Sequence, residues 1–229
     1  MSMTSWHDKE FEDVLLELDT PIEGLSSQEA QSRLDKYGPN KLAEPEKTSA
    51  FMKFLSQYHD PLNYLLMGAA LVALAIDHEH PGDAIFIAIV LTANAFFGYW
   101  QENQAEQAMD ALKQMALSQC IVCRDGLEME IATSELVPGD IVKIEEGLKV
   151  PADLRVSEAW QCKVDESALT GESIPTKLQV EALPIETLLA DRKNMLFMGT
   201  TISTGRAVGI VTSTGMNTEL GKIASDIAG

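Results

Sequence analysis

Basic residues are scarce in this sequence. Its 229 residues include 17 lysine and arginine residues against 35 aspartate and glutamate residues, a formal net charge of -18 at pH 7. Nucleic-acid binding needs clustered lysine and arginine that displace counterions from phosphates, and no basic stripe is present. The composition therefore excludes nucleic acid as a partner. A phosphate-binding lysine loop of the Walker type is also missing from the sequence.

Cysteine is equally rare, and Cys120, Cys123 and Cys162 are the only three. An odd number of cysteines without an N-terminal signal peptide fits a reducing cytosol better than a disulfide framework. Cys120 and Cys123 form a C-x-x-C pair, but their surroundings predict a strand, in which residues i and i+3 face opposite sides. No second ligand pair lies nearby, so we predict no metal site.

Charged residues are missing from two apolar stretches, 62–76 and 84–100, which a short acidic connection joins. The first stretch alone is shorter than the roughly 20 residues that a transmembrane helix needs, and a buried core helix is the alternative. Lys53 precedes the pair and Lys113 follows it, whereas the connection at 77–83 holds no lysine or arginine. This distribution predicts a transmembrane hairpin with both chain ends in the cytosol.

The predicted hairpin extends beyond its apolar stretches. The first span lengthens toward Phe51, with a bend at Pro61, which has no backbone donor. After Trp100 the helical periodicity continues as a cytosolic stalk. We therefore assign residues 51–117 to the hairpin and its stalk, with spans at about 51–76 and 84–100.

Several polar residues in this region admit a functional reading and a simpler one. His78 and His80 lie beside Asp77 and Glu79, a grouping that could bind a metal ion. Short acidic loops between spans are usually solvated turns, so we prefer that simpler interpretation. Asn94 lies within the second span, so we expect it to face a neighbouring helix or a water-filled cavity rather than lipid. Asp60 lies at the cytosolic entrance of the first span, where it could help draw cations inward, but we interpret it as an interfacial residue that ends the apolar stretch.

A small helical segment, residues 1–50, precedes the hairpin. Ser26 and Glu29 form a capping-box pattern that opens a helix, which ends near Tyr37 before a glycine-proline pair. A shorter helix is predicted from Phe11 to Leu18. The segment holds no catalytic constellation, so we assign it at most a docking or regulatory role.

The hydrophobic period changes to two beyond residue 118, which indicates a compact, mainly-β domain over residues 118–229. Asp140 and Asp153 each end a turn signal containing proline, and each aspartate is expected to cap the backbone that follows it. The whole chain is thus predicted to be of the α+β class. The expected strands cover residues 120–123, 141–144, 154–156 and 206–212, and a last helix is expected at 223–229.

The string Thr170-Gly171-Glu172-Ser173 lies within this domain. Gly171 allows close approach to another surface, and Glu172 presents a carboxylate at that point. The hydroxyls of Thr170 and Ser173 can hold a water molecule or the carboxylate in place. Such a group can orient an attacking water, although an exposed polar turn is the simpler reading of four common residues.

The order of the motifs favours the chemical reading. The chain resembles cation-transporting P-type ATPases over nearly its whole length, and it is most similar to the branch with calcium pumps and sodium/potassium pumps. The motifs that carry the resemblance are Gln101-Glu102, 138–142, 150–153, 165–167, 169–173 and 194–200.

In that family the pump phosphorylates its own aspartate, and an actuator domain then rotates so that its loop reaches the aspartyl phosphate. The resemblance implies that Glu172 positions and activates the hydrolytic water. Other residues would shape and brace the loop. The implied catalytic residues are Thr170, Gly171, Glu172 and Ser173, supported by Asp165 and Ser167.

The resemblance implies ATP and Mg²⁺ for the full-length family, but no cofactor site in this chain. The family's Asp-Lys-Thr-Gly-Thr phosphorylation motif is absent, so we expect an N-terminal fragment that does not hydrolyse ATP alone. Its expected partners are the lipid membrane, which we expect to be the cell membrane, the remainder of the pump and a cation of unspecified identity. One alternative is a membrane-anchored, actuator-like protein that binds or regulates an intact pump. The other is a soluble β domain with a buried hairpin.

Overall fold

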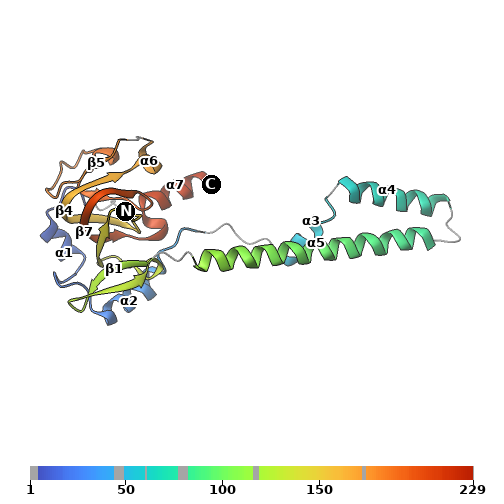
Figure 1. Ribbon diagram of the computed structural model, residues 1–229, viewed down its shortest axis with the longest axis horizontal. Coiled ribbons are helices and arrows are strands. Elements are labelled where there is room, and N and C mark those ends of the chain that lie inside the picture. The colour runs from blue at the N-terminus through green and yellow to red at the C-terminus, as the bar shows by residue number, and fades with distance from the viewer. Residues whose placement is uncertain are drawn as a thin grey trace. The chain divides into compact units, whose positions relative to one another are not determined.

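The computed structural model describes residues 5–43, 49–59, 61–76, 82–115, 119–171 and 174–228. These residues form two compact units. We call the described residues of 5–43 and 119–228 the β unit, and those of 49–115 the helical unit (Figure 1).

An antiparallel sheet forms the centre of the β unit. In the part that the structure describes it has seven strands in the order β2-β1-β3-β7-β4-β5, with β6 also paired to β4. The two longest strands, β4 and β7, pair along most of their length. The strands are β1 (Gln119–Arg124), β2 (Leu127–Ala132), β3 (Ile141–Glu145), β4 (Asp153–Asp165), β5 (Thr176–Lys177), β6 (Met195–Leu196) and β7 (Thr201–Ser213).

The core follows from alternation along these strands. In β1, for example, Cys120 and Val122 are buried while Ile121 between them is exposed. Aliphatic side chains from most of the strands are buried together in one cluster, and their burial supplies the main hydrophobic stabilisation of the unit. The aliphatic members of this core include Val122, Ile144, Val150, Leu154, Val156, Val164, Leu196, Ile202 and Val211.

β4 and β7 approach one another closely where β4 bends near Gln161. Gly205 of β7 has a φ of 78°, and a Cβ atom there would lie 2.3 Å from the carbonyl oxygen of Trp160. A side chain at this position would therefore collide with backbone, which explains the glycine.

Two N-terminal helices pack against the β unit. Helix α1 (Phe11–Glu17) buries Val14 and Leu15 against Ile210 of β7. Helix α2 (Ser27–Tyr37) buries Ala30 in a small cluster with residues outside the helix. The residues before the helical unit are therefore part of the same compact body as the sheet.

The start and end of α2 confirm the sequence prediction. The Ser26 hydroxyl accepts a hydrogen bond from the Glu29 amide at 3.1 Å, and Gly38 ends the helix with a φ of 78°. The reciprocal half of the capping box is replaced, because the Glu29 carboxylate accepts from Arg33 Nε at 2.9 Å instead.

The helical unit contains α3 (Ala50–Ser56), α4 (Pro61–Ile76) and α5 (Gly82–Met115). Helices α4 and α5 pack side by side and run in opposite directions (Figure 1). Asn94 of α5 contacts Asn63 of α4, with Nδ2 3.5 Å from Oδ1, so Asn94 reaches the neighbouring helix as expected, while the residue remains in part exposed.

Helix α5 continues without interruption past Trp100, as the predicted stalk requires. The predicted first span is divided, because α3 ends at Ser56 and α4 begins at Pro61. Among the described residues, no helix has both the length and the apolar character needed to cross a membrane. The residues interpreted as a solvated loop, His78 and His80, lie outside the described residues, as does Asp60.

The α+β class is confirmed, with a mainly-β sheet unit and N-terminal helices. Each of the four predicted strands lies inside an observed strand, although β4 and β7 are much longer than expected. The last helix, α7 (Glu219–Ala228), begins earlier than the predicted residue 223.

Candidate functional site

The segment that carries the predicted site lies at the tip of a hairpin between β4 and β5. Val164 pairs with Thr176 of β5, and the last residue of β4, Asp165, pairs with Thr201 of β7. The segment after Asp165 is therefore held at its base on both sides by strands of the main sheet.

A compact turn forms directly after β4. The Asp165 carboxylate accepts a hydrogen bond from the Ser167 amide at 2.9 Å, and the short helix α6 (Ser167–Thr170) follows. Hydrogen bonds from the Ser167 hydroxyl and amide lower the pKa of the Asp165 carboxyl group. Asp165 thus remains ionised and acts as the acceptor that closes this turn.

Gly171 ends the turn in the left-handed region, with a φ of 77°, and its amide donates to the Ser167 carbonyl at 3.0 Å. The residue is exposed, and a Cβ atom built on it would have no neighbour within 4 Å. Backbone conformation, rather than space, therefore accounts for glycine at this position.

The structure brings Asp165, Ser167 and Gly171 together in one turn. It places the backbone of Thr170 in α6, while Glu172 and Ser173 lie outside the described residues. The two predicted supporting residues thus contact each other, and the implied chemical role of Glu172 stays a prediction.

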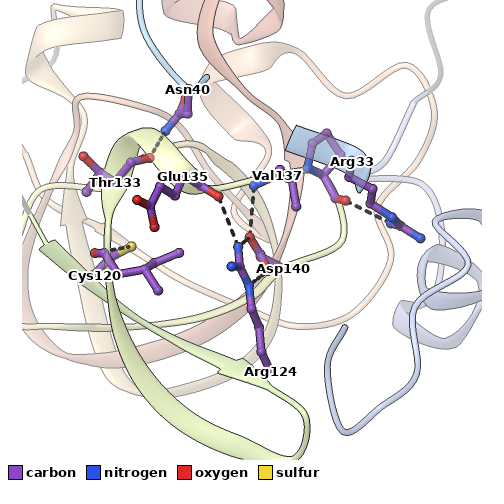
Figure 2. Close-up of polar contacts among 10 residues, drawn as sticks. Arg33, Asn40, Cys120, Arg124, Thr133, Glu135, Val137 and Asp140 are labelled. Carbon is purple, nitrogen blue, oxygen red and sulfur yellow. Dashed lines mark hydrogen bonds and ion pairs between the residues drawn. The ribbon is translucent and has the colours of Figure 1, made fainter. Parts of the chain in front are cut away.

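The aspartates of the two predicted turns, Asp140 and Asp153, have other hydrogen-bond partners than the sequence predicted. Asp140 is fully buried, and its carboxylate accepts from Arg124 Nε at 2.8 Å and from Arg124 Nη2 at 2.7 Å (Figure 2). It also accepts from the amide of Val137, which precedes it. The prediction that Asp140 caps the backbone after it was wrong, because Arg124 and the preceding turn use its oxygens.

Asp153 connects three elements. Its carboxylate accepts from the Met198 amide at 2.9 Å and from the amide of Glu219, the first residue of α7, at 2.8 Å. Here too the predicted cap of the following backbone is wrong, since both donors are distant in sequence. Burial raises the pKa of the Asp153 carboxyl group to about 6, although these two amides act in the opposite direction.

Asn40 connects the N-terminal segment to three loops of the β unit. Its amide nitrogen donates to the carbonyls of Thr133 and Pro151 at 2.9 and 2.8 Å, and its oxygen accepts from the Gly215 amide at 2.8 Å. Figure 2 shows the first of these bonds beside the Arg124–Asp140 pair. Asn40 was not among the residues predicted from the sequence, because no sequence pattern marks it.

Arg33 of α2 makes a second polar connection. Its guanidinium donates to the carbonyls of Leu18 and Pro138 at 2.8 and 2.9 Å, and to that of Asp19 at 2.9 Å. Three carbonyl groups from two segments are thus satisfied by one side chain. Its spacing from Glu29, at i and i+4, was the only sequence signal, and it indicates no more than a helix-surface ion pair.

The predicted C-x-x-C pair lies in β1, as expected. The Cys120 thiol is buried, 3.9 Å from the carbonyl oxygen of Ile131, while the Cys123 thiol donates to the Glu23 carbonyl at 3.2 Å. Burial raises the pKa of Cys120 to about 12, so its thiol stays protonated. Among the residues described here, no group of three metal-ligating side chains is present.

Two protein-family profiles match this chain. The sequence profile of the P-type ATPase actuator domain matches residues 114–228, and that of the cation transporter/ATPase N-terminus matches residues 6–73. The first match contains the sheet strands and the candidate loop.

Individual relatives agree with these profiles. Calcium-transporting ATPase 1 of Bacillus cereus is 42% identical over 229 residues, covering 97% of this chain and 26% of the relative. The calcium-transporting ATPase of Bacillus subtilis is 42% identical over 203 residues, covering 88% of this chain and 23% of the relative. An endoplasmic reticulum-type calcium-transporting ATPase of Arabidopsis thaliana is 38% identical over 218 residues, covering 89% and 20%.

The chain thus spans about a quarter of the length of the Bacillus relatives that it matches. The actuator profile alone covers half of the chain, and it includes the sheet, the turn closed by Asp165 and helix α7. On these grounds the chain belongs to the family of cation-transporting P-type ATPases.

Proposed function

We propose that this chain supplies the actuator of an ATP-driven cation pump, whose loop promotes hydrolysis of an aspartyl-phosphate intermediate. In this proposal Glu172 orients the attacking water and accepts its proton, while Thr170, Gly171 and Ser173 shape the loop around it. ATP, Mg²⁺ and the phosphorylated aspartate belong to the rest of the pump.

The observation that carries the proposal is the turn between Asp165 and Gly171. Its closing hydrogen bond is anchored on β4, and its exit at Gly171 is exposed. A water-positioning carboxylate must reach a phosphate on another surface while its base is held by a rigid element. A turn anchored on the sheet and open at its exit satisfies both requirements.

We also propose that the helical unit enters the lipid membrane as a hairpin, with both of its ends in the cytosol. Support comes from the large apolar side chains that α4 and α5 leave exposed, such as Leu65 at 70%, Leu71 at 68% and Phe86 at 67%. A helix pair that leaves many large apolar side chains exposed is expected to contact lipid or a partner protein. Alkaline extraction of membranes that contain the full chain tests this proposal, because release into the supernatant would contradict membrane insertion.

The central test is Glu172→Gln in the pump that contains this chain. The amide keeps the shape of the side chain but cannot accept a proton, so phosphoenzyme decay is expected to slow by about a hundred- to ten-thousand-fold. Phosphoenzyme is formed from labelled ATP, and its decay is followed after a chase with unlabelled ATP. Ca²⁺ is the first cation tested, because the Bacillus relatives are named calcium-transporting ATPases.

Glu158→Gln is the matched control, since Glu158 is an exposed carboxylate in the middle of β4. Its phosphoenzyme should decay at the wild-type rate. Equal decay rates for wild type and Glu172→Gln would rule out the proposed role of Glu172.

A further inference from the structure

A pocket with a volume of about 320 Å³ opens on the β unit, away from the turn at Asp165 and Gly171. Its walls come from the start of β1, the loop before β4, the loop before β7 and helix α7. This size is at the lower end of the range for small-molecule sites, about 300–1,000 Å³.

The interior of the pocket is apolar. The apolar lining side chains are Ile144, Leu148, Val150, Pro151, Met198 and Leu220. The thiol of Cys120 also lines it and stays protonated, because burial raises its pKa to about 12. An apolar chain would therefore meet hydrocarbon and sulfur surface in this interior.

The polar groups of the inner wall are already used. Asn40 lines the pocket, but its amide is satisfied by the carbonyls of Thr133 and Pro151 and by the Gly215 amide. Burying an apolar chain here would consequently leave none of these hydrogen-bonding groups without a partner.

Backbone hydrogen bonds fix one wall of the pocket. The amide of Val150 donates to the Thr200 carbonyl, and the amide of Gly199 donates back to the Val150 carbonyl. The amide of Ile202 donates to the Leu148 carbonyl at 3.0 Å. The wall is thus held before any ligand arrives, which reduces the ordering cost of binding.

A cation stands at the opening. Lys149 is exposed and lines the pocket, and no carboxylate among the described residues forms an ion pair with it. The other lining lysine, Lys143, already pairs with Glu128. An anionic group at the opening would therefore meet a cation that no carboxylate of the described residues already neutralises.

We propose that this pocket binds a single-chain fatty acid, with its hydrocarbon tail in the apolar interior and its carboxylate at Lys149. A chain with one anionic end matches both properties, and a two-chain lipid exceeds the volume. This site does not depend on the proposed phosphatase role of Glu172. Its tail would contact both the loop at Leu148 and helix α7 at Leu220.

The test uses the purified full chain and decanoate that carries a photoreactive diazirine at the end of its tail. Cross-links mapped by mass spectrometry should fall on residues around Leu148, Met198 and Leu220. Unlabelled decanoate should abolish them in a saturable way, whereas decanol at the same concentration should compete much less. Cross-links found only in the helical unit would overturn the proposal, because they would report simple partition into apolar surface.

Two variants make the test specific. Lys149→Gln should weaken decanoate competition by about two- to fivefold, the range that one exposed ion pair contributes. Lys163→Gln, which removes an exposed lysine that does not line this pocket, should leave it unchanged. Equal losses in both variants would overturn the assignment of Lys149, and stronger competition by a lysophospholipid than by decanoate would overturn the choice of a free fatty acid.

Discussion

Arg124 of β1 holds the buried carboxylate of Asp140 through two parallel hydrogen bonds, from Nε at 2.8 Å and from Nη2 at 2.7 Å. Such a fork is the strongest geometry for an ion pair between two side chains. Removing one partner leaves the other buried without its counter-charge. Arg124→Met is therefore expected to reduce the unfolding free energy of the β unit by about 3–5 kcal/mol. Amide hydrogen exchange of β1 and β3 in the full chain measures this change.

An exposed ion pair in the same sheet provides the control. Lys143 of β3 pairs with Glu128 of β2, and both side chains are largely open to solvent. Lys143→Met should change exchange in these strands by no more than about 0.5 kcal/mol. If the two methionine variants exchanged alike, the buried pair would not have the structural importance assigned to it.

Asn40→Ala should loosen the N-terminal segment from the sheet unit. The substitution leaves the Gly215 amide and the Thr133 and Pro151 carbonyls without their side-chain partner. Each group left unsatisfied costs about 1–3 kcal/mol unless water replaces the lost bond. Faster hydrogen exchange is expected at residues near Thr133 and Gly215.

Gln31→Ala provides the comparison, because Gln31 is exposed and its side chain bonds only to Asp35 within α2. This variant should leave exchange near Thr133 unchanged. Unaltered exchange in Asn40→Ala would show that apolar packing of α1 and α2 is sufficient for docking.

The parts of the fold that the sequence predicted are those with local signals. Helix α2 has a serine cap and a terminal glycine, and the strands found by period-two alternation lie in the core of the sheet. One strand was missed although its signal was present. Asp125 and Gly126 have φ values of 52° and 73°, which is the two-residue hairpin turn that an Asp-Gly pair favours, and β2 follows it directly.

Buried polar side chains could not be predicted in the same way. Arg155 lies on β4 among consecutive buried residues, since one face of the strand packs on the core and the N-terminal segment lies against the other. Its Nη2 donates to the Lys9 carbonyl at 2.9 Å, a residue far away in sequence. Alternation alone would place an arginine in solvent, so its burial depends on tertiary packing that no local pattern encodes.

The candidate site was predictable in part. The motif order located the loop, and the turn between Asp165 and Ser167 follows from the tendency of aspartate to bond to the amide two residues on. What the motif did not reveal is the connection of β4 to α7 through Asp153 and Glu219, because that contact joins residues on different elements.

Asp153 should make the stability of the β unit depend on pH. Its pKa is raised to about 6 in the folded state from the ordinary value of 3.8, so between these values the folded state retains a proton that the unfolded state has released. The stabilisation that this proton gives is fully present below the pKa of Asp153 in the unfolded state, and it is lost as pH rises through the pKa of Asp153 in the folded state. The unfolding free energy of the β unit is expected to decrease by an amount on the order of 1–3 kcal/mol between pH 4 and pH 7.

Asp153→Asn removes this titration. Hydrogen exchange of α7 and β4 measured across the same pH range should show a smaller slope in the variant than in the wild type. Because asparagine retains only one acceptor oxygen, the variant should also lose either the Met198 or the Glu219 contact, and exchange at one of these amides should rise. An identical pH slope in both proteins would assign the dependence to another group.

Asp165 and Ser167 are expected to position the loop rather than to take part in the chemistry. Asp165→Ala removes the acceptor for the Ser167 amide and frees the start of α6. In the pump that contains the chain, phosphoenzyme decay should slow, and exchange of the Gly171 amide should become faster. Asp165→Asn keeps an acceptor oxygen and should restore most of both properties. A structural role predicts that decay and Gly171 exchange change together across the three proteins. A variant that slows decay without altering exchange would instead place Asp165 in direct contact with the reacting groups.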